Sequence, residues 1–273
     1  MAAFKAACVQ LRSTDDVDEN IRAASALIRE ARAMGADFIA TPENTTLMAP
    51  DGGAKIEKTF TEETDPALPA FRALAKELGI HLLIGSLAIK VSDKKTANRS
   101  FLIGPDGAIA ARYDKIHLFD VDLPSGESYR ESNTVAGGER AVLAETPWGR
   151  MGLTVCYDLR FPQLYRKLAQ AGSFLLTVPA AFTETTGKAH WHTLLRARAI
   201  ENGAFVIAPA QGGLHANGRR TYGHSLIIAP WGEILAEGGT EPGVIIAGID
   251  PALAADARGR VPNLRHDRDF QGP

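Results

Sequence analysis

The chain has 273 residues, and 45% of them are hydrophobic, which is enough to bury a large core in an α/β domain. The net charge is −2 and the basic residues are scattered, so the sequence indicates no basic patch that would bind nucleic acid or an anionic membrane surface. The sequence has two cysteines, no secretory leader pattern and no apolar run long enough to span a bilayer. It therefore predicts a cytoplasmic protein with free thiols.

The first part of the chain alternates between strands and helices. Apolar residues recur every three or four positions over residues 17–34, as one helix face requires, and Gly35 suits the end of that helix. A second helix is expected over residues 69–78. Short apolar runs predict strands over residues 4–10, 38–40 and 81–87. This order is typical of helices packed on a sheet.

The middle of the chain has a different pattern. Residues 100–103 and 108–113 flank the turn sequence Gly-Pro-Asp-Gly and predict a hairpin. Residues 141–145 and 149–155 predict another. Between the hairpins, residues 114–139 have little periodicity, and loops this long inside a compact domain are usually functional.

The last part returns to alternation. Helices are expected over residues 162–171 and 189–202, and strands over residues 174–179, 204–209, 225–229, 234–236 and 244–249. Two βαβ-like halves that each carry hairpins predict two sheets packed face to face with helices outside, a four-layer α-β-β-α sandwich. No linker or repeat divides the sequence, so one domain over residues 1–273 is expected.

Cys156 is a candidate nucleophile. It follows an apolar strand and precedes a sharp turn and a helix that begins near Pro162. A thiol at such an elbow lies close to a helix N-terminus, whose dipole lowers the thiol pKa, and the following backbone N–H groups can hold an oxyanion. Most free cysteines are instead small buried hydrophobes, which is what we expect of Cys8 in the first strand.

Glu43 and Lys115 are candidate partners for such a nucleophile. Glu43 comes at the C-terminal end of a strand, where α/β proteins place ligands, and burial there would raise its pKa toward that of a useful general base. Lys115 follows another strand, and a fixed ammonium can stabilise a developing oxyanion. Taken singly, each is more typical of a solvated surface charge, and His117 is expected to be a hydrogen-bonded loop histidine.

The sequence contains no pattern typical of a metal or cofactor site. His190 and His192 are two residues apart and would not share a helix face. There is no Cys-x-x-Cys pair, no P-loop, no glycine-rich dinucleotide motif and no Gly-x-Ser-x-Gly elbow. We therefore expect no metal and no cofactor, which argues against a metal-dependent amidohydrolase.

Three segments, in the order Glu, Lys, Cys, resemble motifs of the nitrilase superfamily of carbon–nitrogen hydrolases. They are residues 40–44 (Ala-Thr-Pro-Glu-Asn), 113–120 (Tyr-Asp-Lys-Ile-His-Leu-Phe-Asp) and 155–162 (Val-Cys-Tyr-Asp-Leu-Arg-Phe-Pro). The likeness extends over nearly the whole chain. It implies the α-β-β-α sandwich, a homodimer, and a triad in which Cys156 is the nucleophile, Glu43 the base and Lys115 the oxyanion stabiliser.

The resemblance also implies a second glutamate between the lysine and the cysteine. Glu127 and Glu131 both lie in that interval, and the run of residues 129–133 (Tyr-Arg-Glu-Ser-Asn) favours Glu131. This glutamate would orient Lys115 through charge-assisted hydrogen bonds.

Within the superfamily the Nit branch fits best, on residues 117–124, 187–201 and 222–225. Substrates of that branch are acidic. The resemblance therefore implies an amidase that converts the amide of a small carboxylate-bearing substrate to acid and ammonia through a cysteine thioester. Residues 210–215 (Ala-Gln-Gly-Gly-Leu-His) are more similar to deaminated glutathione amidases than to ω-amidases of short keto-acid amides. An ω-amidase, a nitrilase and a binding module with an inactive site are the alternatives.

Several side chains are expected to contact the substrate. The backbone N–H of Tyr157 would help to hold the oxyanion. Three arginines could receive a carboxylate and two aromatic residues could wall the pocket: Arg160, Arg219, Arg220, Phe182 and Trp191. Each arginine could equally be a surface charge or a partner of Asp158, and both aromatic rings could belong to the core.

Overall fold

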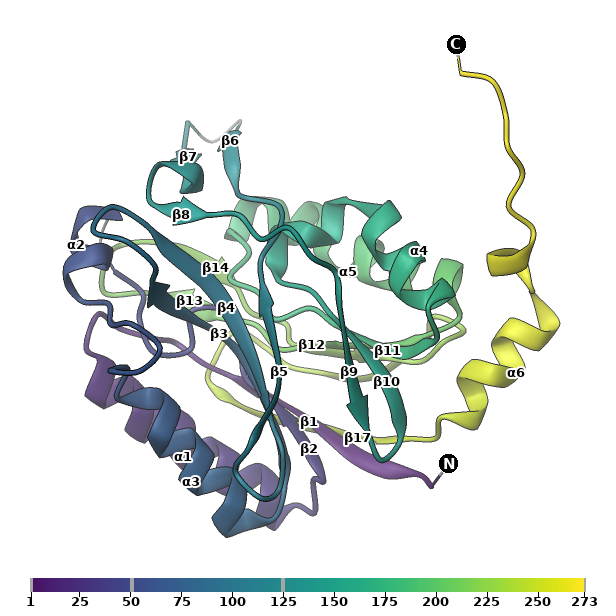
Figure 1. The fold of residues 1–273 in the computed structure, drawn as a ribbon, viewed down its shortest axis with the longest axis horizontal. Coiled ribbons are helices and arrows are strands. Elements are labelled where there is room, and N and C mark those ends of the chain that lie inside the picture. Colours follow the sequence, from purple (N-terminus) through teal and green to yellow (C-terminus); the bar gives the residue numbers. More distant parts are fainter. Residues whose placement is uncertain (1, 50–51, 124–125, 273) are drawn as a thin grey trace.

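Two β-sheets lie face to face at the centre of the molecule in the computed structural model, with helices on both outer sides (Figure 1). This arrangement confirms the predicted four-layer α-β-β-α sandwich. The structure describes residues 2–49, 52–123 and 126–272. Pro124, which ends one of the motifs noted in the sequence, lies outside the described residues.

The first sheet combines parallel and antiparallel pairs. Its strand order is β17 (Gly243–Ile249), β1 (Phe4–Gln10), β2 (Phe38–Ala40), β3 (His81–Lys90), β4 (Thr96–Ile103) and β5 (Ile109–Asp114), and β8 (Val135–Ala136) pairs with β4. Helices α1 (Val17–Ala33) and α3 (Ala67–Leu78) bury their apolar faces with those of β1 and β3 in one cluster. The apolar period of residues 17–34 therefore describes a helix packed on this sheet.

The second sheet has the same arrangement of central parallel strands and antiparallel edges. Its order is β16 (Ile234–Glu237), β15 (Leu226–Ile228), β12 (Phe205–Ala208), β11 (Ser173–Thr177), β10 (Gly149–Leu153) and β9 (Val142–Thr146). Helices α4 (Pro162–Gln170) and α5 (Glu184–Asn202) pack on it. The facing sides of the two sheets meet in one core. Cys8 is fully buried in that core, as expected.

Two helices begin earlier than their apolar period predicts, because polar side chains cap them. Helix α3 begins at Ala67 because the Asp65 carboxylate accepts hydrogen bonds from the N–H groups of Ala67 (2.9 Å) and Leu68 (3.0 Å). Helix α5 begins at Glu184, where the Thr183 side chain is the N-cap, rather than at residue 189.

The remaining elements are short and were not predicted. They are α2 (Gly52–Glu57), β6 (Asp120–Asp122), β7 (Ser128–Arg130), η1 (Glu131–Asn133), η2 (Cys156–Arg160), β13 (Gly212–Leu214), β14 (Arg220–Tyr222), α6 (Ala252–Arg260) and η3 (Asn263–Arg265). Most have three to six residues, too few to display a hydrophobic period.

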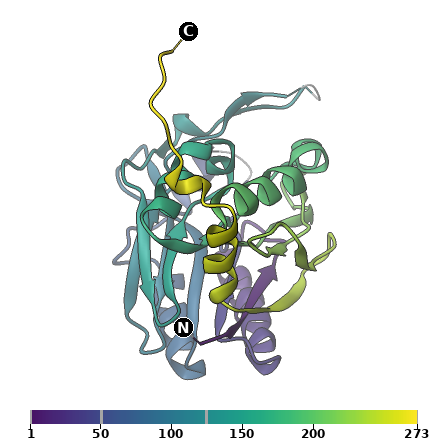
Figure 2. The same cartoon turned by 90° about the vertical axis from the view of Figure 1, so that its right-hand side faces the viewer.

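Helix α6 and the tail after it run along one side of the molecule (Figure 2). The tail returns to α4, where Arg166 pairs with Asp267 and donates a hydrogen bond to the Asn263 carbonyl (2.8 Å). Pro273 lies outside the described residues. Within the described part of the chain, no helix combines the length and the hydropathy needed to cross a membrane.

Gly85 of β3 allows the loop after β2 to approach the sheet. A Cβ at this position would lie 2.1 Å from the Thr41 carbonyl oxygen and 2.5 Å from the carbonyl of Pro42. We expect Gly85→Ala to lower the free energy of unfolding by about 1–3 kcal/mol, the range typical of an overpacked site. Urea denaturation measures the change. Gly248→Ala is the control, since a Cβ there meets nothing within 4 Å. Equal midpoints for the two variants would contradict the prediction.

Candidate active site

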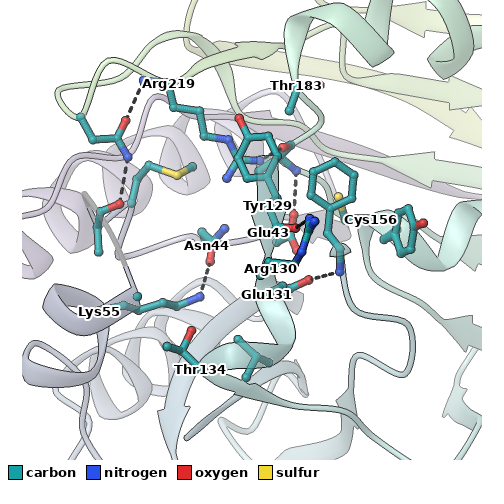
Figure 3. Close-up of a pocket in the computed structure, with 18 of the residues that line it drawn as sticks. Glu43, Asn44, Lys55, Tyr129, Arg130, Glu131, Thr134, Cys156, Thr183 and Arg219 are labelled. Carbon is teal, nitrogen blue, oxygen red and sulfur yellow. Dashed lines mark hydrogen bonds between the residues drawn. The ribbon is translucent and has the colours of Figure 1, made fainter. Parts of the chain in front are cut away.

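The three side chains of the predicted triad line one cavity, although they come from distant parts of the chain. The cavity has a volume of about 860 Å³, and Glu43, Lys115, Glu131 and Cys156 all contribute to its wall (Figure 3). They lie in the loop after β2, directly after β5, in η1 and at the start of η2, respectively. A cavity of this size fits a small-molecule site.

A buried ammonium between two carboxylates forms the centre of the site. The Lys115 Nζ donates to Glu43 Oε1 at 2.9 Å and to Glu131 Oε2 at 2.8 Å. Lys115 is 1% exposed and Glu43 is 3% exposed. Charges buried to this extent are tolerated only when they are paired and hydrogen-bonded, so the three groups require one another.

Further donors hold both carboxylates in place. The Asn98 side-chain amide on β4 donates to Glu43 Oε1 (2.9 Å) and to Glu131 Oε1 (3.2 Å). Glu43 Oε2 accepts from the backbone N–H of Ala181 (2.9 Å), and Glu131 Oε2 accepts from that of Phe119 (2.7 Å). Both carboxylates are thus oriented by fixed donors as well as by the ammonium.

A strained elbow places Cys156 against this cluster. Its φ is +51°, a left-handed conformation that costs a non-glycine residue roughly 1–2 kcal/mol. The elbow is held on both sides, since Cys156 N–H donates to the Pro179 carbonyl (2.9 Å) and Val155 N–H donates to Asp158 Oδ2 (2.8 Å). Strain of this kind is kept where the surroundings over-determine it, as they do in active sites.

The Asp158 carboxylate holds the elbow in place and also contacts His117. The buried carboxylate accepts from the Tyr113 hydroxyl (2.7 Å) and from the His117 backbone N–H (3.0 Å), and it lies 2.7 Å from His117 Nδ1. The expectation that His117 is a hydrogen-bonded loop histidine is confirmed. No described arginine pairs with Asp158 in the salt bridges of the structure, contrary to the alternative role considered for the arginines.

Two expectations about ionisation were wrong. Burial opposes ionisation of Glu43, but the neighbouring Lys115 ammonium outweighs it and holds the pKa of Glu43 well below its usual range. Burial and the Glu43 carboxylate raise the pKa of the Cys156 thiol well above its usual value, despite Lys115. The resting site therefore holds a neutral thiol, a carboxylate and an ammonium, and the helix dipole does not determine the state of the cysteine.

The structure distinguishes between the two glutamates that the sequence left open. Glu131 contacts Lys115, whereas Glu127 accepts a hydrogen bond from the Tyr129 hydroxyl at 2.9 Å. The 3-10 turn η1, which follows the short strand β7, turns Glu131 inward.

Three of the six expected substrate contacts line the cavity and three do not. Tyr157, Phe182 and Arg219 are part of its wall. Arg160 is not part of the lining: its guanidinium lies 3.3 Å from His190 Nδ1 and 5.4 Å from the centre of the Phe182 ring. Trp191 is buried behind Phe182, with ring centroids 4.8 Å apart, and is a core residue.

Arg220 is the third residue that does not line this cavity. It lines a separate hollow of about 310 Å³ instead of the cavity that holds Cys156. Neighbouring residues in extended backbone point to opposite sides, so Arg220, the first residue of β14, and Arg219, which directly precedes it, do not share a cavity.

Two residues of the site were missed. Asn98 is a buried polar residue of β4, but the same strand also contains Thr96, Arg99 and Ser100, so its sequence does not single out Asn98. Lys55 lies on the short helix α2 and lines the cavity, but no motif or period singles it out.

The fold gathers one cluster of possible metal ligands that the sequence spacing did not suggest. His192 Nε2 and His224 Nδ1 each lie 2.9 Å from Glu237 Oε1. Both histidines hydrogen-bond to the Glu237 carboxylate, and the three residues do not belong to the cavity lining. The expectation of no metal site stays a prediction.

Known proteins resemble the chain over almost its full length. The family model described as carbon-nitrogen hydrolase matches residues 5–259. A deaminated glutathione amidase of Synechocystis sp. is 42% identical over 271 residues, which cover 97% of this chain and 98% of that protein. An ω-amidase of Homo sapiens is 35% identical over 268 residues, covering 98% and 96% of the two chains.

A solved structure has a similar fold. The C. elegans NitFhit protein superposes with a TM-score of 0.92 at 34% sequence identity. The alignment covers 98% of this chain and 66% of that longer one.

The charges of the cluster predict a diagnostic alkylation profile. Because the Glu43 carboxylate raises the pKa of the Cys156 thiol, Glu43→Gln should lower that pKa and leave Lys115 to stabilise the thiolate. We expect iodoacetamide to modify the variant at lower pH than the wild type, with the rate followed by intact mass from pH 6 to 10.

Cys156→Ala is the control for that experiment, because it should show no labelling while folded. Cys8 is fully buried, and burial raises the pKa of its thiol far above the usual value. If Glu43→Gln shifts the profile to higher pH or leaves it unchanged, the Glu43 charge does not control the thiol.

Proposed function

The chain belongs to the carbon–nitrogen hydrolase family, and we propose that it hydrolyses the amide of a small carboxylate-bearing substrate through a thioester on Cys156. The observation that carries the proposal is the contact between Cys156, Glu43 and Lys115 at the wall of one cavity. A nucleophile, a base and a fixed cation are what acyl transfer from an amide needs.

In the proposed first step, Glu43 accepts the Cys156 proton as the sulfur attacks the amide carbonyl carbon. The carbonyl oxygen becomes an oxyanion, which the Lys115 ammonium and the Tyr157 N–H stabilise. The C–N bond then breaks, Glu43 returns the proton to the departing nitrogen, and a thioester remains. Proton transfer must accompany attack, because the raised thiol pKa leaves little thiolate beforehand.

In the second step, Glu43 accepts a proton from a water molecule that attacks the thioester carbonyl. The C–S bond breaks, the carboxylic acid leaves and the proton returns to Cys156. Glu131 and Asn98 act as positioning residues: Glu131 fixes the ammonium, and Asn98 holds the two carboxylates at one separation.

We propose deaminated glutathione as the substrate, with ω-amidase activity on short keto-acid amides as the alternative. The Synechocystis relative carries the first name and the human relative the second. Deaminated glutathione is an N-substituted amide, so its leaving group is cysteinylglycine, whereas a primary amide releases ammonia. The cavity of about 860 Å³ is roomy for a five-carbon keto-amide and suits a tripeptide-sized molecule.

We further propose that residues 1–273 act as one carbon–nitrogen hydrolase domain, in a cytoplasmic homodimer. The two cysteines, both free, agree with a reducing compartment. The homodimer rests on the family resemblance, and light scattering at micromolar concentration tests it.

Removing the nucleophile is expected to abolish turnover without unfolding the protein. Cys156→Ala should keep the wild-type melting temperature to within a few degrees, or exceed it, since the strained elbow loses only a sulfur atom. Lys115→Met should lower kcat by at least about 10²–10³-fold, as expected for a lost oxyanion donor. Product formation at saturating substrate measures both effects. Wild-type activity in Cys156→Ala would overturn the assignment.

The choice of substrate is tested with a matched panel. Deaminated glutathione and α-ketoglutaramate both yield 2-oxoglutarate, so one coupled assay measures both. We expect kcat/KM to be about 10- to 100-fold higher for deaminated glutathione, which one additional charge-assisted hydrogen bond can supply. A preference for α-ketoglutaramate would indicate an ω-amidase, and turnover of simple nitriles alone would indicate a nitrilase.

A further inference from the structure

Two of the cations that line the cavity have no carboxylate partner among the described residues. Lys115 pairs with Glu43 and Glu131, and Arg130 forms two contacts with Asp122, at 2.8 and 2.9 Å. Lys55 and Arg219 enter no ion pair in the described part of the chain, yet both line the cavity.

The Arg219 guanidinium is held in place by neighbouring groups, but its Nε–H has no acceptor among the described residues. Its Nη2 donates to the Ala181 carbonyl at 2.7 Å, and its guanidinium lies 5.3 Å from the centre of the Tyr129 ring. Its backbone N–H donates to Asn217 Oδ1 (2.9 Å). The Nε of Arg219 is buried and, within the described residues, has no hydrogen-bond partner. A buried donor without an acceptor is costly, so an acceptor is expected there when the site is filled.

Lys55 reaches the cavity from helix α2, and its single hydrogen bond within the described residues is to Asn44 Oδ1, at 3.4 Å. Burial lowers the pKa of Lys55, and the charges of Glu131 and Glu43 only partly oppose this. Both of those carboxylates already contact Lys115. Lys55 is half-buried, and an anion beside it would therefore compensate a charge that has no carboxylate partner among the described residues.

We propose that Lys55 and Arg219 form two separate anion subsites, which select an amide with two carboxylates over one with a single carboxylate. Figure 3 shows the two side chains entering the cavity from different elements and from opposite sides, with Asn44 and Glu43 between them. This inference rests on the proposed amidase function, and it names Lys55 as a specificity-determining residue that no sequence motif marks.

The distribution of charge supports two subsites rather than one. Lys55 and Arg219 repel each other, since each lowers the stability of a second positive charge nearby. A substrate with one carboxylate would satisfy one cation and leave the other uncompensated. A substrate with a carboxylate at each end would satisfy both. Deaminated glutathione has this charge pattern, and a short keto-acid amide lacks the second carboxylate.

The test compares deaminated glutathione with its glycinamide analogue, which has the same size and one carboxylate fewer. Wild type should show a kcat/KM about 10- to 100-fold higher for the acid, as expected for loss of a charge-assisted contact. Of Lys55→Gln and Arg219→Gln, one should reduce this ratio to about one. The other should lower kcat/KM for both compounds by a similar factor, because it loses the carboxylate they share. Both substitutions should raise KM by a larger factor than they lower kcat.

Charge-preserving and distant variants complete the design. Lys55→Arg and Arg219→Lys should keep most of the preference for the acid. Lys58→Gln, just beyond helix α2, removes a surface lysine that pairs with Asp15 and should change neither ratio nor rate. Melting temperatures identify any variant that fails to fold, in which case its charge-preserving counterpart carries the comparison.

The outcomes separate this inference from the function on which it rests. If wild type hydrolyses neither compound, the proposed function fails. If wild type hydrolyses both and both glutamine variants keep the wild-type ratio of acid to glycinamide, the function stands and the two-subsite inference is overturned. Loss of kcat without any change in KM or in the ratio would also overturn it, because it would indicate a structural role.

Discussion

The Lys115 ammonium, buried between the carboxylates of Glu43 and Glu131, is the interaction on which the rest of the site depends. A single buried charge costs several kcal/mol, and removal of one partner from a buried pair is strongly destabilising. The three side chains come from the loop after β2, the end of β5 and the turn η1. Because the three charges must remain in contact, they constrain the position of η1 and of the loop after β2 relative to the end of β5.

That cluster also determines the state of the nucleophile. A nearby ammonium lowers the pKa of a thiol, but here burial and the adjacent Glu43 carboxylate outweigh Lys115 and raise the pKa of Cys156. The neutral thiol of Cys156 is therefore favoured at rest. In the proposed mechanism, a substrate carbonyl that draws on Lys115 as its charge develops also weakens the hold of the ammonium on Glu43. The base then becomes stronger at the moment it is needed.

The wall of the cavity is built differently from its catalytic centre. Around Lys115 every charge has a partner, whereas Lys55 and Arg219 are cations without carboxylates in the described residues. Paired charges hold a geometry, and unpaired charges in a cavity attract a ligand of opposite sign. In the proposed function, the residues that perform the chemistry are thus separate from those that select the substrate, and the two sets lie on different elements.

The sequence alone determined most of the regular elements and the layered fold, and it supplied the candidates for the reactive residues. Alternation of apolar periods located β1, α1 and β2 to within a residue, and three ordered motifs indicated Glu43, Lys115 and Cys156. These features are local, because a period or a motif is contained in a few consecutive residues.

Only the tertiary structure decided which charges meet. It placed Glu131 rather than Glu127 at Lys115, brought Asn98 and Lys55 into the site, and removed Arg160, Trp191 and Arg220 from it. It also reversed the expected direction of the pKa shifts of Glu43 and Cys156. The physical reason is that ionisation and ligand contacts depend on distance and burial in three dimensions, and residues separated by 72 positions, such as Glu43 and Lys115, share no local signal.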